Sequence, residues 1–156
     1  SLFAILVPDS RPVASREPAV PTVRLPLSAV PEPSEGPPCL RVLLVDDHRI
    51  VREGIAATLA GEQDVQIVGQ AANGREAVDL ARQLQPDVVV MDVAMPIMAG
   101  DEATQQIKRD LPGTRVVALS MLENAGTARR MRRAGAAAYL LKTAPSEELL
   151  AAIRGK

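Results

Sequence analysis

The sequence predicts an α/β protein in which five parallel strands alternate with five helices. From residue 40 onward, apolar runs of about five residues alternate with segments whose apolar residues recur at helical spacing. This is the pattern of βαβ units. Most of the runs are nearly continuous, as expected for strands covered on both faces. Only four of the 13 prolines follow residue 39, so this region can sustain regular structure.

The five apolar runs are the expected strands. Residues 65–70 (Val-Gln-Ile-Val-Gly-Gln) are the most mixed of them, which suits a strand at the edge of the sheet. The other runs are rich in Val, Leu and Ala, which predicts burial on both faces. They comprise residues 40–45, 88–91, 115–119 and 137–141.

After each strand, apolar side chains repeat every three or four residues and therefore share one face of a helix. In the first expected helix these are Val51, Ile55 and Leu59. Asn73 can cap the second helix, and Pro145 suits the first turn of the last one. The expected helices are residues 49–59, 74–84, 101–111, 127–134 and 145–153.

The other nine prolines lie within the first 39 residues. Each removes a backbone donor and biases the preceding residue toward extended geometry, so we expect residues 8–38 to form a semi-stiff spacer. The apolar run at residues 2–7 has no basic flank and is too short for a signal core or a membrane span. We therefore expect a Pro-rich linker over residues 1–39 and a compact domain over residues 40–156.

Charge and composition exclude several classes of protein. The 18 basic and 19 acidic residues leave a net charge of −1, so non-specific binding to nucleic acid or to an anionic membrane is not expected. Cys39 is the only cysteine and His48 the only histidine, which excludes an internal disulfide and a Cys/His zinc site. This cysteine usage fits a reducing, cytoplasmic compartment.

Polar side chains stand at the carboxyl ends of four expected strands. In an open parallel sheet these ends share one edge, where ligands bind. Three carboxylates in one crevice repel one another unless a pKa rises or a cation binds, and an oxygen-only ligand set favours Mg²⁺. The sequence therefore predicts a magnesium site there. The residues are Asp46 and Asp47 after the first strand, Asp92 after the third, Ser120 after the fourth and Lys142 after the fifth.

The same edge offers the groups that phosphoryl transfer needs. An aspartate can act as a nucleophile, and a cation beside Asp92 would neutralise an arriving phosphoryl group. Lys142 and the Ser120 hydroxyl would supply a second cation and a donor to the other phosphate oxygens. Any one of these residues could simply mark where a strand reaches solvent, but their joint occurrence favours a phosphoacceptor site.

Four motifs resemble the receiver domain of two-component response regulators, across nearly all of residues 40–156. The resemblance implies a flavodoxin-like (βα)5 doubly wound sheet with strand order 2-1-3-4-5. It implies a function in a phosphorelay, in which a histidine kinase or a histidine phosphotransfer domain donates a phosphoryl group. It also implies that the chain catalyses its own phosphorylation and dephosphorylation. The motifs are Val45-Asp-Asp-His48, Met91-Asp-Val-Ala-Met-Pro96 with Gly100, Ser120, and Tyr139-Leu-Leu-Lys142.

The resemblance implies a role for each matching residue. Asp92 would be the phosphoacceptor, and Lys142 would contact the phosphoryl group. Ser120 and Tyr139 would be the switch hydroxyl and the switch aromatic, which alter the surface of the fourth helix, the fifth strand and the fifth helix. The implied Mg²⁺ ligands are Asp46, Asp47, Asp92 and the main-chain carbonyl of Ala94.

The chain departs from the family at several positions. Thr143 follows Lys142 where the family often has proline, so we expect a trans peptide bond there. Met121 is larger than the small residue common after the switch hydroxyl and is expected to narrow access to the phosphoacceptor. Ala94 and Leu122 stand where the family often tunes dephosphorylation. Neither side chain can orient a water, so we expect a long-lived phosphoryl state.

Other interpretations of these residues are less favoured. His48 could be a ligand or a phosphorylated histidine, but a histidine at the start of a helix more often faces solvent. The arginines at positions 129, 130, 132 and 133 lack interleaved aromatics, which favours a solvated face over DNA binding. A haloacid dehalogenase-type phosphatase would have a second aspartate where Ala94 stands. A nucleotide-binding flavodoxin-like module would have a glycine-rich first turn.

Two contexts for the domain remain open. Residues 1–8 (Ser-Leu-Phe-Ala-Ile-Leu-Val-Pro) resemble the closing strand of a histidine-kinase ATPase domain. Together with the linker they favour the C-terminal receiver of a hybrid sensor kinase. Residues 138–142 and 146–150 resemble the receivers of helix-turn-helix transcriptional regulators, so a truncated regulator is the alternative. We expect no direct nucleic-acid binding, no membrane segment and a homodimer through the implied switch surface.

Overall fold

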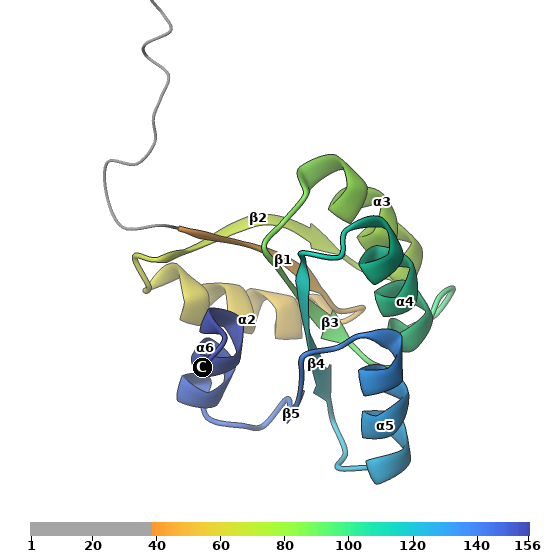
Figure 1. Cartoon of the computed structure of the whole chain (residues 1–156). Helices are drawn as coiled ribbons and strands as arrows, with labels where there is room; N and C mark the ends of the chain where they lie inside the picture. The colour runs from red at the N-terminus through yellow and green to blue at the C-terminus, as the bar shows by residue number, and fades with distance from the viewer. Residues whose placement is uncertain (1–38) are drawn as a thin grey trace, which may run out of the picture. The chain divides into compact units, whose positions relative to one another are not determined.

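A computed structural model describes residues 39–156, in which five strands and five helices alternate as predicted (Figure 1). The predicted kinase-domain remnant and all but the last residue of the predicted linker lie outside the described residues. None of the described helices is long and apolar enough to cross a membrane. The elements are β1 (Leu40–Val45), α2 (Arg49–Ala60), β2 (Val65–Ala71), α3 (Gly74–Leu84), β3 (Val88–Asp92), α4 (Gly100–Asp110), β4 (Arg115–Ser120), α5 (Ala125–Ala134), β5 (Ala138–Leu141) and α6 (Ser146–Arg154).

The strands form one parallel sheet in the order β2-β1-β3-β4-β5, which confirms the predicted flavodoxin-like topology. β1 pairs with β2 on one side and with β3 on the other. After β1 the chain forms β2 on one side of β1, and it then crosses to the other side of β1 to form β3. This reversal places a crevice at the carboxyl ends of β1 and β3, where ligands bind in such sheets.

Both faces of the sheet are covered by helices, which explains the nearly continuous apolar runs. Leu43 and Met91 belong to a core cluster that includes residues of α3, α4 and α5. Their neighbours Val42 and Val90 belong to a second cluster, with residues of α2 and α6. Figure 1 shows α2 and α6 on one side of the sheet and α3, α4 and α5 on the other. Successive strand residues are therefore buried on opposite faces.

Three details of the predicted elements need correction or addition. β5 was predicted to be covered on both faces, but its residues are half-buried because it has a neighbouring strand on one side only. Pro145 precedes α6 as its N-cap and does not lie in its first turn. α5 begins earlier than predicted, because the Asn124 side chain accepts a hydrogen bond from the Thr127 N–H (2.9 Å). The predicted cap of α3 is confirmed, since Asn73 accepts from the Glu76 N–H (2.9 Å).

The loop between β3 and α4 is closely packed. A Cβ atom at Gly100 would overlap the carbonyl oxygen of Asp92, and one at Gly74 would overlap the carbonyl oxygen of Met98. Ile97 has a φ of 72°, in the left-handed region that β-branched residues rarely adopt, although its side chain is 80% exposed. The backbone at Gly74 and Gly100 therefore leaves no room for a side chain.

Candidate functional site

The strand ends that carry the predicted site residues meet at one edge of the sheet. Asp46 follows β1 directly, and Lys142 follows β5. Asp92 is the last residue of β3, and Ser120 is the last residue of β4. Because β3 lies between β1 and β4, Asp92 stands in the middle of this edge. The structure thus brings Asp46, Asp92 and Lys142 together from three separate strands.

Lys142 lies between two carboxylates. Its Nζ is 2.7 Å from Asp46 Oδ2 and 3.2 Å from Asp92 Oδ1, and its side chain is 7% exposed. Burial acts to lower the pKa of Lys142, but the hydrogen bonds and charges of the two aspartates outweigh it, so this pKa lies above its ordinary value. The peptide bond to Thr143 is trans, as expected. Lys142 is therefore a permanent cation held inside the site.

Asp92 is buried, and its negative charge is disfavoured. Burial, followed by the charge of Asp46, raises the pKa of Asp92 from its ordinary value of 3.8 to about 6. Lys142 opposes this rise, as does the Ala94 N–H, which donates to Asp92 Oδ1 at 3.3 Å. Asp92 Oδ2 is buried without a hydrogen-bond partner within residues 39–156. This oxygen has free lone pairs, as a nucleophile or a metal ligand requires.

Asp46, Asp47 and Asp92 form an acidic cluster. One ligand atom from each lies within 4.8 Å of the others, and the ring of His48 meets the same criterion. Buried carboxylates without enough positive charge raise the free energy of the folded state, and a cation relieves this cost. Carboxylate oxygens are the hard ligands that Mg²⁺ prefers. The side chains present therefore fit a divalent cation.

His48 lies closer to the cluster than the sequence indicates. Its side chain is 69% exposed, as expected for a solvent-facing residue, yet Nδ1 lies 3.0 Å from Asp47 Oδ1. Its main-chain N–H donates to Asp46 Oδ1 at 2.8 Å. Its position directly after the acidic pair was the available signal.

The two predicted switch residues share one acceptor. The Ser120 hydroxyl donates to the carbonyl oxygen of Leu122 (2.9 Å) and accepts from the Leu122 N–H (3.2 Å). The Tyr139 hydroxyl donates to the same carbonyl oxygen at 3.1 Å. The Ser120 hydroxyl is therefore hydrogen-bonded to Leu122, in the loop after β4, and not to Asp92.

A cavity of about 310 Å³ opens above Asp92. Met121 and Leu122 line it and are 63% and 74% exposed, so they form part of its rim. Met121 thus lines the same cavity as Asp92, and its effect on access to Asp92 stays a prediction. Two further lining residues, Ser120 and Lys142, are predicted site residues.

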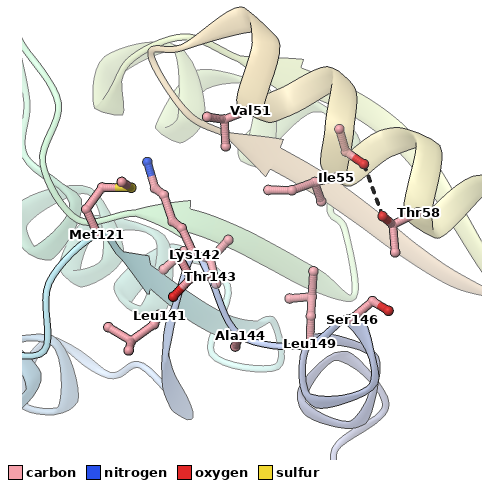
Figure 2. A pocket seen from close by; sticks show the side chains of 12 residues that line it. Val51, Ile55, Thr58, Met121, Leu141, Lys142, Thr143, Ala144, Ser146 and Leu149 are labelled. Carbon is pink, nitrogen blue, oxygen red and sulfur yellow. Dashed lines mark hydrogen bonds between the residues drawn. The ribbon is translucent and has the colours of Figure 1, made fainter.

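A second, larger cavity of about 390 Å³ lies between α2 and the β5–α6 segment (Figure 2). Ile55 of α2 and Leu149 of α6 both line it, and the Leu149 side chain points toward α2. Met121 and Lys142 line both cavities. No carboxylate lines the larger one, so the chemistry of the site belongs to the smaller cavity above Asp92.

Two arginines that were not predicted as site residues also contribute to this site. Arg52 of α2 donates from a guanidinium nitrogen to the main-chain carbonyl oxygen of Asp46 (2.5 Å). Arg130 of α5 lines the cavity above Asp92. Both side chains extend from neighbouring helices to the strand ends. The spacing of residues along the sequence does not predict contacts of this kind.

Comparison with known proteins places this chain in a family. The model of the response regulator receiver domain matches residues 42–154. The response regulator GacA of Pseudomonas aeruginosa is 46% identical over 115 residues, which are 74% of this chain and 54% of that protein. The transcriptional regulatory protein LiaR of Bacillus subtilis is 44% identical over the same length and the same shares. The chain thus spans about half the length of these relatives.

Solved structures agree with this match. The receiver domain of the putative response regulator NarL from Mycobacterium tuberculosis has a TM-score of 0.71 and 31% identity, covering 77% of this chain and all of that chain. A LuxR-family response regulator from Aurantimonas has a TM-score of 0.72 and 36% identity, covering 75% of this chain and 84% of that chain. The fold, the acidic cluster and the matched range lead to one conclusion: the chain belongs to the family of response regulator receiver domains.

Proposed function

We propose that Asp92 is the phosphoacceptor of this receiver domain and takes a phosphoryl group from a phosphohistidine of a histidine kinase or phosphotransfer domain. One observation carries the proposal. Asp92 lies at the centre of the site with one oxygen on Lys142 and the other free, and the cavity gives a donor access to it. A buried polar atom without a hydrogen-bond partner calls for an explanation, and a role as nucleophile or metal ligand supplies one for Asp92 Oδ2.

The transfer balances without a further reactant. A bond forms between an Asp92 oxygen and phosphorus while the phosphorus–nitrogen bond of the phosphohistidine breaks, and the departing imidazole takes a proton from solvent. Lys142 leaves its contact with Asp92 Oδ1 to bind a phosphoryl oxygen. When bound, Mg²⁺ would neutralise charge on the carboxylates and on the phosphoryl oxygens. We assign its ligands to Asp46, Asp47, Asp92 and the main-chain carbonyl of Ala94.

The shared acceptor gives this domain a route from the site to its surface. If the Ser120 hydroxyl turns to a phosphoryl oxygen, the Leu122 carbonyl oxygen keeps Tyr139 as its remaining side-chain donor. We propose that this change repositions the loop after β4 and alters the surface of α5, β5 and α6. Ala94 and Leu122 offer no polar group to hold an attacking water, which supports a long-lived phosphoryl state. A lifetime of only seconds in the presence of Mg²⁺ would contradict this last point.

The test is phosphate uptake from a small phosphodonor with Mg²⁺, followed by intact mass. The wild type is expected to gain one phosphoryl group and Asp92→Asn none. Asp79→Asn is the matched control, because Asp79 is an exposed aspartate of α3 away from the strand ends. Equal uptake by Asp92→Asn and the wild type would refute the assignment of Asp92.

Metal binding is tested separately by thermal denaturation with and without Mg²⁺. Mg²⁺ is expected to raise the melting temperature of the wild type, because a ligand that binds only the folded state stabilises it. Asp47→Asn removes one proposed ligand and should reduce this rise, while Asp79→Asn should retain it. A rise of the same size in Asp47→Asn would remove Asp47 from the ligand set.

Two parent proteins remain as proposals, with a linker over residues 1–39 and the receiver over residues 40–156. The Pro-rich segment and residues 1–8 support the C-terminal receiver of a hybrid sensor kinase. The relatives support the second candidate, a transcriptional regulator, because they are response regulators and LiaR is a transcriptional regulatory protein. The gene on both sides distinguishes them: a phosphoacceptor-histidine helix with ATP-binding boxes upstream, or a helix-turn-helix downstream. Either parent would place this domain in the cytoplasm.

Charge complementarity supports a homodimer through α5, β5 and α6. α5 has no acidic residue in its first turn and carries four exposed arginines, whereas the first turn of α6 carries Glu147 and Glu148. Opposed copies could pair these charges. Light scattering of the phosphorylated domain should show a dimer, and a monomer at every concentration tested would contradict the proposal.

A further inference from the structure

The cavity above Asp92 contains a second permanent cation besides Lys142. Lys142 already contacts Asp46 and Asp92 at 2.7 and 3.2 Å. Arg130 is the other lysine or arginine that lines this cavity. Its one ion pair within residues 39–156 is loose, because Nε lies 3.5 Å from Asp101 Oδ2. The Arg130 side chain is 58% exposed and that of Asp101 is 35% exposed. It therefore retains donors for a ligand.

The geometry of α5 explains why this arginine reaches the cavity and its neighbours do not. Side chains on a helix point toward its N-terminus, so a residue covers the turn that precedes it. Asn124 and Thr127 line the cavity at the start of α5, and Arg130 is three residues after Thr127, on the same face. Arg129 is also exposed but does not line this cavity.

His48, Asn124 and Thr127 also line this cavity, but of its lining residues only Arg130 and Lys142 are lysines or arginines. Ala94, Met121 and Leu122, which line the same cavity as Asp92, are apolar. Ser120 is engaged with the Leu122 main chain. A negative charge that develops on the solvent side of a phosphoryl group would therefore find Arg130 as its cationic partner.

We propose that Arg130 is a specificity-determining residue that favours phosphodonors with an anionic leaving group, as in an acyl phosphate. The proposal rests on the proposed role of Asp92. When an Asp92 oxygen bonds to the phosphorus of an acyl phosphate, the phosphorus–oxygen bond to the acyl group breaks. The electron pair stays on that oxygen, and a carboxylate leaves without a proton. Arg130 stabilises this carboxylate. A phosphoramidate releases ammonia, which is neutral and gains nothing from the guanidinium.

The experiment compares phosphorylation rates from acetyl phosphate and from phosphoramidate at saturating Mg²⁺. Arg130→Gln is expected to be about two- to fivefold slower with acetyl phosphate, the range for an exposed charge pair, and unchanged with phosphoramidate. Arg130→Lys should restore part of the rate. Arg109→Gln, at an exposed arginine in the last turn of α4 that does not line this cavity, is the control and should match the wild type with both donors. Asp101→Asn removes the competing carboxylate and should speed the reaction with acetyl phosphate only.

Two outcomes would overturn the proposal. In the first, Arg130→Gln lowers the rate of phosphorylation by the same factor with both donors, which means that the residue supports the structure of the site. In the second, it lowers the rate with neither donor. The ratio of the two rates is the decisive quantity, because a loss of folded protein changes both rates together. Failure of the underlying function looks different: the wild type takes up phosphate from neither donor, or Asp92→Asn takes it up from both.

Discussion

The charge of Asp92 is expected to destabilise the domain when no cation is bound, so Asp92→Asn should make the domain more stable. Asparagine keeps the shape of the side chain and removes its charge. It also keeps an oxygen that can accept from Lys142 and from the Ala94 N–H, the two groups that contact Asp92 Oδ1. What it removes is the repulsion from Asp46 and the cost of burying a negative charge.

The magnitude follows from the pKa of Asp92, which burial and then Asp46 raise from 3.8 to about 6. This difference in pKa corresponds to about 3 kcal/mol between the charged and neutral carboxyl group. Because the amide still has to be buried and hydrogen-bonded, we expect a gain of about 1–3 kcal/mol in the free energy of unfolding at pH 7.5. For a domain of this size that is a rise in melting temperature of about 4–12 °C.

The gain should depend on pH in one direction. The folded-state pKa of Asp92 lies above its unfolded value, so the folded protein binds the proton more tightly. The wild type therefore recovers stability as the pH falls from about 6 toward 3.8, where its carboxyl group becomes neutral. The difference between the variant and the wild type should be largest above pH 6 and should close near pH 4.

The assay is urea denaturation in EDTA at a series of pH values, with Asp79→Asn as the control for removal of an exposed charge. Mg²⁺ should then stabilise the wild type more than Asp92→Asn, because the variant has lost a proposed ligand. The reasoning is refuted if Asp92→Asn is no more stable than the wild type at pH 7.5 in EDTA, or if its advantage persists unchanged at pH 4.

Three further changes test the geometry around the site. Ile97→Gly should stabilise the domain by up to about 1 kcal/mol, because a left-handed backbone costs a residue with a Cβ roughly 1–2 kcal/mol. The control is Ile50→Gly, at a similarly exposed isoleucine within α2. This variant should be less stable than the wild type in the same urea titration. Gly100→Ala should lower the free energy of unfolding by about 2 kcal/mol or more, because the added Cβ overlaps the Asp92 carbonyl oxygen. Gly54→Ala, with nothing within 4 Å of the added Cβ, should raise it by about 0.5–1 kcal/mol. Thermal denaturation measures both. Tyr139→Phe should cost about 1 kcal/mol by removing the hydrogen bond to Leu122. Equal effects within either pair, or an unchanged stability of Tyr139→Phe, would contradict these contacts.

The order of elements was predictable because a sheet covered on both faces leaves a strong signal. Val42, Leu43, Leu44 and Val45 alternate between the two core clusters, so every position of the strand must be apolar. β5 lacks this constraint as an edge strand, and its apolar residues misled the prediction of full burial. The start of α5 was missed because its first residues, Ala125 and Gly126, carry no large apolar side chain, although Asn124 before them is of a type that caps helices.

The candidate site was predictable in part for a similar reason. Topology brings the carboxyl ends of parallel strands to one edge, so Asp46, Asp92 and Lys142 could be placed together from their position after apolar runs alone. The orientation of Ser120 toward Leu122 was not predictable, since it depends on the conformation of a loop. Arg130 was missed because its contact with the cavity is set by the packing of a helix and the length of its side chain.

Three unfavourable features occur between Asp92 and Gly100: a buried charge with a raised pKa, a left-handed isoleucine, and a backbone with no room for a Cβ atom. Strain of this kind persists only where the surrounding structure holds it, and β3, buried along its whole length, provides that support. The first feature differs from the other two in its physical origin. A cation or a proton removes the cost of a buried charge, but neither relieves a backbone conformation. The difference in stability between the wild type and Asp92→Asn should therefore change with Mg²⁺ and pH, whereas the difference between the wild type and Ile97→Gly should depend on neither.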